Sequence, residues 1–366
     1  MADATSLLWS EAVGRGAADW PEGKPRTTRT TLPFFDQQRL VRRHSPVFWL
    51  HNKDQYRPQS FERYLQCCEL WFHPGHGAAP QLVLSRGAVN TESLATAKTA
   101  TGAAAQQPVL QDGRVRTDRR WQLKCDPRNH YGASTSELGE TPVYAFVRDS
   151  SVHGEPCYAI TYAAFYPYNG PYHVGSLCCR VLAGGHEADV EHVTLLISRA
   201  DEELRALWFN AHHASQGLLV PASELETMEF ADGCHATVVY VAENGHGHYS
   251  SPGTTHRVSC LANDHTQRGE LWRPTPVVLP EAWDDEALRR TGTSWLRYGG
   301  TLGTAHSVSD WHHCSHEEQR EPSWRVHEVG SVPCGIATKA WWVQDQNRWE
   351  STSWFHRMFC LCWSYK

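Results

Sequence analysis

The sequence predicts an all-β protein, an antiparallel β-sandwich with long loops and a few short helices. Short apolar runs recur along the chain, and Gly, Pro, Asn and Asp separate them at short spacings. The 366 residues include 16 Trp, an unusually high number. Patterns that could form long helices are few. A chain with these three properties is typical of a sandwich or barrel.

Each expected strand is a run of apolar or β-branched residues between turn residues. The first helix should start at Pro58 and Ser60 and end near Leu65. The best later helix candidate is 281–290, with acidic residues early and basic residues late, as the helix dipole favours. Residues 86–117 have few large apolar side chains and predict a long surface loop, part of it helical. The expected strands are 45–50, 69–73, 82–84, 120–124, 143–147, 157–166, 190–198, 203–210, 218–220, 225–230, 237–241 and 257–261.

The chain divides into three expected parts. Residues 1–40 lack an apolar period and predict a flexible N-terminal arm. Residues 41–340 should form one β-sandwich domain. Residues 341–366 are rich in Trp and Phe and should pack back on that domain as an aromatic tail.

The charge and the apolar pattern of the sequence indicate where the protein is located and which partners it lacks. The net charge of −6 gives no basic surface for nucleic acid. No apolar run approaches the ~20 residues that span a bilayer. No basic segment precedes the apolar patch Leu7-Leu8-Trp9, so we expect no secretory signal and a cytoplasmic protein.

The 12 cysteines include the adjacent pairs Cys67-Cys68 and Cys178-Cys179, but no Cys-x-x-Cys pair. This pattern does not predict a structural zinc knuckle. In a cytoplasmic protein we expect mostly reduced, partly buried thiols. A disulfide framework is the alternative.

Residues 185–197 carry the strongest chemical signal. Asp189 and Glu191 are two apart on an expected strand, so they should share one face about 7 Å apart. Two carboxylates this close repel unless a cation lies between them or one is protonated. His186 follows a Gly-Gly turn and could fold over the same spot. These residues predict half of a metal site; the alternative is two exposed acids beside a turn histidine.

A second candidate is the run Gly245-His246-Gly247-His248, whose glycines allow close approach of the backbone to another segment or a ligand. His246 or His248 could face the same cleft as His186. The alternative is a hairpin turn with histidines facing solvent.

Three spaced blocks resemble one known family. They are 165–170 (Phe-Tyr-Pro-Tyr-Asn-Gly), 189–194 (Asp-Val-Glu-His-Val-Thr) and 244–253 (Asn-Gly-His-Gly-His-Tyr-Ser-Ser-Pro-Gly). In this order, and with further agreement at 46–58, 212–224 and 263–266, they resemble the vacuolar protein sorting-associated protein 62 family over about residues 45–305. The run 185–191 is more distantly similar to the necrosis- and ethylene-inducing peptide cytolysins.

The resemblance to the cytolysins implies a divalent-cation site. Carried over residue by residue, its ligands would be His186, Asp189 and Glu191, with Asn169 in the place of a further Asp. Oxygen ligands with one imidazole suit Mg²⁺, Ca²⁺ or Mn²⁺ better than Zn²⁺. The neutral Asn169 should weaken the binding of a hard cation. The residues expected around the site, in a ligand cleft, are Tyr168, His192, His246 and His248.

Three functions fit these patterns. The favoured one is an intracellular, non-catalytic module that binds a glycan, a lipid headgroup or a protein partner. The second is a metal-dependent hydrolase with His192 or His246 as base. The third is a membrane-active, cytolysin-like protein, which the many Trp residues favour.

Overall fold

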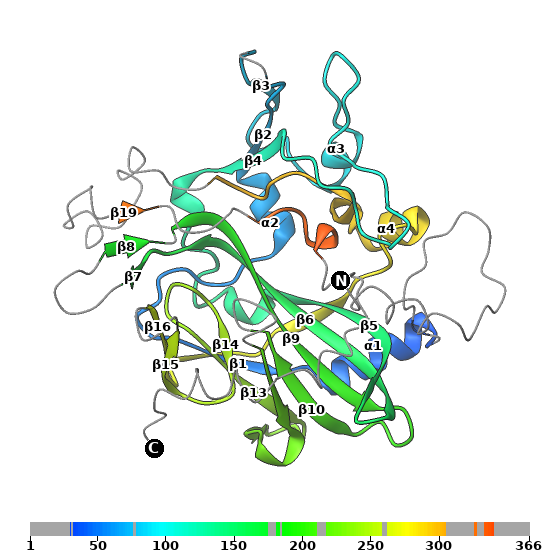
Figure 1. Cartoon of the computed structure of the whole chain (residues 1–366), viewed down its shortest axis with the longest axis vertical. Coiled ribbons are helices and arrows are strands. Elements are labelled where there is room, and N and C mark those ends of the chain that lie inside the picture. Colours follow the sequence, from blue (N-terminus) through cyan, green and yellow to red (C-terminus); the bar gives the residue numbers. More distant parts are fainter. Residues whose placement is uncertain are drawn as a thin grey trace, which may run out of the picture.

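The central layer of the protein is a six-stranded sheet (Figure 1). The computed structural model describes residues 30, 32–75, 78–174, 181–183, 185–210, 217–257, 262–304, 326–327 and 333–339. In spatial order the strands of the sheet are β11 (Leu218–Pro221), β10 (Leu204–Phe209), β9 (His186–Ser198), β6 (Glu155–Asn169), β5 (Pro142–Val152) and β18 (Thr275–Val278).

A second sheet covers one face of the central layer. Phe48, Val239 and Trp272 from this sheet pack against Tyr162 and Val193 of β6 and β9 in one apolar core. The strands are β12 (Thr227–Glu229), β13 (His235–Val241), β1 (Val47–Leu50) and β17 (Glu270–Trp272), and β14 (His248–Tyr249) pairs with β13. The two sheets therefore face each other across this core.

The other face of the central layer is covered by helices and a small sheet (Figure 1). Phe61 of α2 (Phe61–Gln66) and Leu70 and Leu123 of this sheet pack against Phe165 of β6. Its strands are β3 (Gln81–Leu84), β2 (Cys68–Phe72) and β4 (Trp121–Cys125). Strand β6 is therefore apolar on both sides, as its sequence indicated.

A further sheet lies at the end of β6. It contains β15 (Gly253–Arg257), β16 (Ala262–Thr266), β7 (Tyr172–Val174), β8 (Val181–Ala183) and β19 (Val326–His327).

The sheets are mixed, so the prediction of a strictly antiparallel sandwich was too narrow. Strand β1 pairs in parallel with β13, β18 with β5, and β19 with β8. Parallel neighbours need a long crossover, and here each pair is joined by more than a hundred residues of chain. Alternating polarity along a strand does not show which distant strand will be its neighbour.

The predicted helix after Ser60 is confirmed as α2, because the Ser60 hydroxyl accepts a hydrogen bond from the Arg63 N–H and caps its start. The later helix, α4 (Asp285–Thr291), begins four residues after the predicted start because Asp284 is its N-cap. Gly292 closes it with φ of 71°.

Two further helices lie in the segments expected to be an arm and a surface loop, and the second is the helical part expected within that loop. α1 (Phe34–Arg43) lies partly inside the expected arm, and its Leu40 and Val41 are buried. α3 (Thr91–Thr96) lies in the expected surface loop, where Leu94 is also buried. That loop is therefore anchored in the core.

The remaining expectations lie largely outside the described residues. They concern residues 1–29, the aromatic tail 341–366 and most of the strand 257–261. Within the described ranges, no helix has the length and apolarity needed to cross a bilayer.

Candidate functional site

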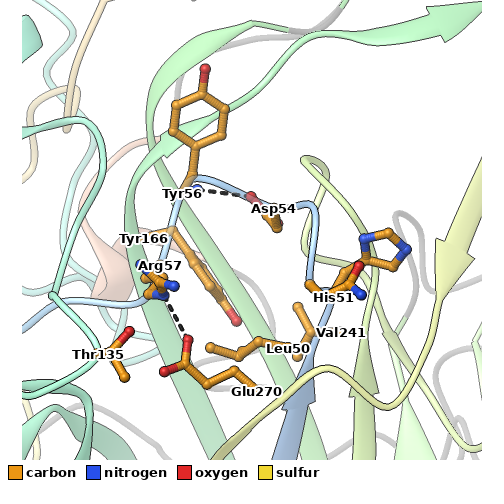
Figure 2. Close-up of a pocket in the computed structure, with 10 residues that line it drawn as sticks. Leu50, His51, Asp54, Tyr56, Arg57, Thr135, Tyr166, Val241 and Glu270 are labelled. Atoms are coloured by element: carbon orange, nitrogen blue, oxygen red, sulfur yellow. Dashed lines mark hydrogen bonds and ion pairs between the residues drawn. The ribbon is translucent and has the colours of Figure 1, made fainter.

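A cavity of about 280 Å³ opens beside the end of β1, between β6, β13 and β17 (Figure 2). Its apolar walls are Leu50 and Val241. Its other lining residues carry polar side chains or contribute backbone: His51, Asn52, Asp54, Tyr56, Arg57, Thr135, Tyr166 and Glu270.

A buried histidine lies directly behind this cavity, between two carboxylates. His246 Nδ1 is 3.0 Å from Asp189 Oδ2, and His246 Nε2 is 3.1 Å from the Tyr56 carbonyl oxygen and 3.4 Å from Asp54 Oδ2. The His246 side chain is fully buried. Asp54 comes from the loop after β1, Asp189 from β9 and His246 from the β13–β14 connection.

The surroundings of His246 favour its imidazolium form. Each ring nitrogen faces atoms that only accept hydrogen bonds, so both nitrogens must carry a proton to bond them. Burial opposes the positive charge, but Asp54 and Asp189 together outweigh it and raise the pKa of His246 to about 10. The chain thus supplies its own cation between its carboxylates.

The connection that carries His246 is a tight loop with an unusual backbone. Asn244 and His246 have φ of 61° and 51°, in the left-handed region. The Asn244 N–H donates to Asp54 Oδ2 at 3.0 Å, and the Ala242 N–H donates to the Gly247 carbonyl at 2.9 Å. Asp54 Oδ1 accepts from the Tyr56 N–H at 2.8 Å. These bonds hold the two loops together around the imidazolium.

Tyr166 connects the buried ion pair with the cavity. Its ring lies parallel to the His246 ring, with centroids 3.8 Å apart and 2° between the planes, an arrangement that favours the cation. Its hydroxyl is buried and has no hydrogen-bond partner among the described residues. Figure 2 shows this hydroxyl pointing into the cavity, toward Leu50 and Glu270.

The remaining charges of the cavity are paired. Arg57 Nε donates to Glu270 Oε2 at 2.8 Å, on the side opposite His51 (Figure 2). Burial lowers the pKa of His51, although Glu243 and Asp54 oppose this shift. Burial thus favours the neutral form of His51.

Comparison with known families gives one match. The model of the family described as vacuolar protein sorting-associated protein 62 matches residues 26–268, about two thirds of the chain and nearly all of the site. The chain belongs to this family. None of the curated proteins compared with it matches.

Several solved structures are remotely similar to this member of the vacuolar protein sorting-associated protein 62 family. One, described as a toxin fold for microbial attack and plant defence, is 14% identical, with 74% of this chain and 84% of that chain covered and a TM-score of 0.32. NLPPya in complex with glucosamine is 15% identical, with 74% and 82% covered and a TM-score of 0.29. Necrosis and Ethylene inducing Protein 2, from the causal agent of witches' broom disease of cocoa, is 15% identical, with 71% and 92% covered and a TM-score of 0.24.

The four predicted metal ligands of this family member do not form a metal cluster. The β6–β9 ladder pairs Asn169 with His186, and Asp189 and Glu191 share a face, as predicted. However, His186 Nδ1 lies 2.8 Å from the Ala188 carbonyl, and Asp189 is engaged by His246. Within the described part of the chain, no three His, Cys, Asp or Glu side chains are grouped to hold a metal. The predicted divalent-cation site has no support from this geometry.

Of the predicted cleft residues, His246 is at the buried ion pair, next to the cavity but not in its wall. His192 and His248 are buried and uncharged, because burial lowers the pKa of each to about 3. Tyr168 stacks on His130, with ring centroids 4.4 Å apart. None of the four lines the cavity.

Sequence reasoning missed three important residues. Asp54 looked like part of a polar turn, and Tyr166 like one more apolar strand residue. Glu187 is almost fully buried and accepts hydrogen bonds from the backbone N–H groups of Cys125 and Thr304, at 3.1 Å each. For Tyr166, the signal was present in the Tyr-Pro-Tyr-Asn-Gly block; for Asp54 and Glu187 only the tertiary contacts reveal the role.

Proposed function

We propose that this protein is a non-catalytic binding module, and that its cavity takes a small, uncharged, hydroxyl-rich molecule such as a monosaccharide. The observation that carries this proposal is the Tyr166 hydroxyl, which is buried, points into the cavity and has no partner in the described structure. An unpaired buried hydroxyl costs about 1–3 kcal/mol. A ligand hydroxyl would recover that free energy.

Charge balance favours an uncharged ligand. The Arg57 guanidinium is paired with Glu270, and Asp54 accepts from two backbone N–H groups and faces His246. A cationic ligand would have to break one of these pairs to find a counter-ion, and so would an anionic one. Breaking a paired, partly buried charge costs more than a neutral hydrogen bond contributes.

The size and lining of the cavity suit one sugar ring. Its volume of about 280 Å³ is at the small end of ligand sites. Leu50 and Val241 offer apolar contact to C–H groups, while Thr135, Asn52 and Glu270 surround them with donors and acceptors. Apolar walls with a few convergent polar groups are typical of binding sites for small molecules.

The chemistry of His246 favours binding over hydrolysis. A general base must be unprotonated at the working pH. Because the pKa of His246 is raised to about 10, this imidazolium does not act as a base near pH 7. The expected alternative base, His192, does not line the cavity.

The proposal is tested by titrating the protein with glucose, myo-inositol, glucosamine and glucose 6-phosphate, with calorimetry or NMR as readout. We expect a neutral compound to bind and its charged analogue to bind at least tenfold more weakly. Tyr166→Phe should weaken binding of the neutral ligand about tenfold, which corresponds to the free energy of one hydrogen bond.

The matched control is Tyr162→Phe, because the buried Tyr162 hydroxyl donates to the Val41 carbonyl, away from the cavity. It should leave affinity unchanged. The proposal fails if no neutral compound binds, or if Tyr166→Phe binds it as tightly as the unaltered protein.

A further inference from the structure

Two cysteines face each other across the small sheet that covers the second face of the central layer. The β2–β4 ladder places Cys68 directly opposite Cys125. Both side chains are almost completely buried, at 0% and 1% exposure, and both thiols are free. Residues directly opposite each other on antiparallel strands point to the same face of the sheet, so the two thiols share one pocket of the core.

Backbone hydrogen bonds show which kind of pair this is. The Asp126 N–H donates to the Cys67 carbonyl at 3.1 Å, so Cys67 and Asp126, the neighbouring pair of the ladder, are the hydrogen-bonded pair. The Cys125 N–H points away from β2 and donates to Glu187 Oε2. Cys68 and Cys125 therefore form a non-hydrogen-bonded pair, the closer of the two kinds, with Cα atoms about 4.5 Å apart. That spacing is within the range of about 4.4–6.8 Å that a disulfide spans.

The surroundings of the two thiols are consistent with direct contact. Burial, and next the contact with Cys125, raise the pKa of Cys68 above its ordinary value. Cys67, beside Cys68 in sequence, is partly exposed, and β2 begins only after it. Cys68, and not Cys67, is the residue aligned with Cys125.

We propose that Cys68 and Cys125 are a redox pair that closes to a cross-strand disulfide when the chain folds in the presence of a disulfide oxidant such as oxidised glutathione. One cysteine thiolate attacks the oxidant and releases one glutathione thiolate. The second then attacks the mixed disulfide and releases the other glutathione. The two protein thiols lose two protons and two electrons, and one oxidised glutathione becomes two reduced molecules.

The location gives the bond a structural consequence. The disulfide would link the two ends of the long segment between β2 and β4 and so make it a closed loop. This segment carries β3 and α3. Closing a long loop removes conformational entropy from the unfolded chain and stabilises the fold. The bond would also fix Cys125, whose N–H holds Glu187, two residues before Asp189 on β9.

The test is to refold the full chain with oxidised and reduced glutathione, block the remaining thiols and map disulfides by mass spectrometry of peptides. We expect a Cys68–Cys125 linkage, and a melting temperature several degrees above that of the reduced protein. Burial should make the same linkage form much more slowly when oxidised glutathione is added to folded protein.

Cys67→Ala is the matched variant and should keep both the linkage and the rise in melting temperature. Cys125→Ala should lose both. If Cys125→Ala does not fold, the peptide map of Cys67→Ala still shows whether the Cys68–Cys125 linkage forms. Free thiols at Cys68 and Cys125 after oxidative refolding, or a Cys67–Cys125 linkage in their place, would overturn the proposal.

Discussion

Asp189 and His246 form a buried ion pair with 3.0 Å between Oδ2 and Nδ1, although 57 residues separate them in sequence. Asp54 completes the arrangement from the opposite side of the ring. This arrangement holds the beginning of β9, the loop after β1 and the β13–β14 connection together. Asp54 lines the cavity that we propose as the ligand site, and so does Tyr166, which stacks on the His246 ring.

Replacing Asp189 tests the strength of this ion pair. Asp189→Asn leaves a buried imidazolium with one carboxylate, and removing one partner of a buried pair costs about 3–5 kcal/mol. We expect a loss of about 3 kcal/mol in the free energy of unfolding, measured by urea denaturation. The control is Glu203→Gln, which removes an exposed partner of Arg43 and should cost less than about 1 kcal/mol. Equal effects of the two variants would contradict the account.

Stability should also fall at alkaline pH because of His246. Its folded pKa, about 10, is above the unfolded value of about 6.5, so the folded state binds the proton more tightly. The stabilisation is complete below pH 6.5 and is lost as the pH rises from there through 10. The measurement is the free energy of unfolding between pH 6 and 10 for the protein and for His246→Gln.

The difference between the two curves isolates His246 from buried tyrosines and cysteines that also titrate at high pH. It should shrink steadily as the pH rises. A difference that stays constant across this range would show that folding does not raise the pKa of His246.

Gly170→Ala tests how tightly the loops pack at the site. An added Cβ would lie 2.4 Å from a ring carbon of Tyr56 and 2.9 Å from Asn244 Oδ1. Overpacking of this kind costs about 1–3 kcal/mol, and we expect that loss in thermal or urea unfolding. Gly139→Ala is the control, because no atom lies within 4 Å of its added Cβ and the change should be nearly neutral.

Tyr166→Phe should leave the ligand-free protein at least as stable as the unaltered protein. The hydroxyl has no partner in the described structure, so removing it relieves a desolvation cost of about 1 kcal/mol. Melting temperatures without ligand check this. A clear destabilisation would mean that the hydroxyl makes a hydrogen bond to a group of the protein itself. The main observation in favour of a ligand in the cavity would then be wrong.

Much of the sheet structure could be predicted from local patterns. The strands around Val47, Tyr162 and Leu195 and the helix capped by Ser60 follow from apolar runs and turn residues. The parallel pairing of β1 with β13 could not be predicted, since Val47 meets Val238 only through tertiary structure.

The site was predicted in part. Asp189 and His246 were both singled out, but as a metal ligand and a cleft residue, because the sequence pairs Asp189 with Glu191 and does not show where a compensating positive charge comes from. The source is a histidine on another strand connection, and its second partner is Asp54, 192 residues earlier by the numbering. No local pattern links residues so far apart.

The protonation of His246 is the point on which the site depends, and ¹⁵N NMR of the imidazole ring measures it directly. At pH 7.5 both ring nitrogens should carry a proton, and the signals should change only as the pH approaches 10. A ring with one unprotonated nitrogen at pH 7.5 would contradict the account, because Asp54 and Asp189 would then need another cation between them.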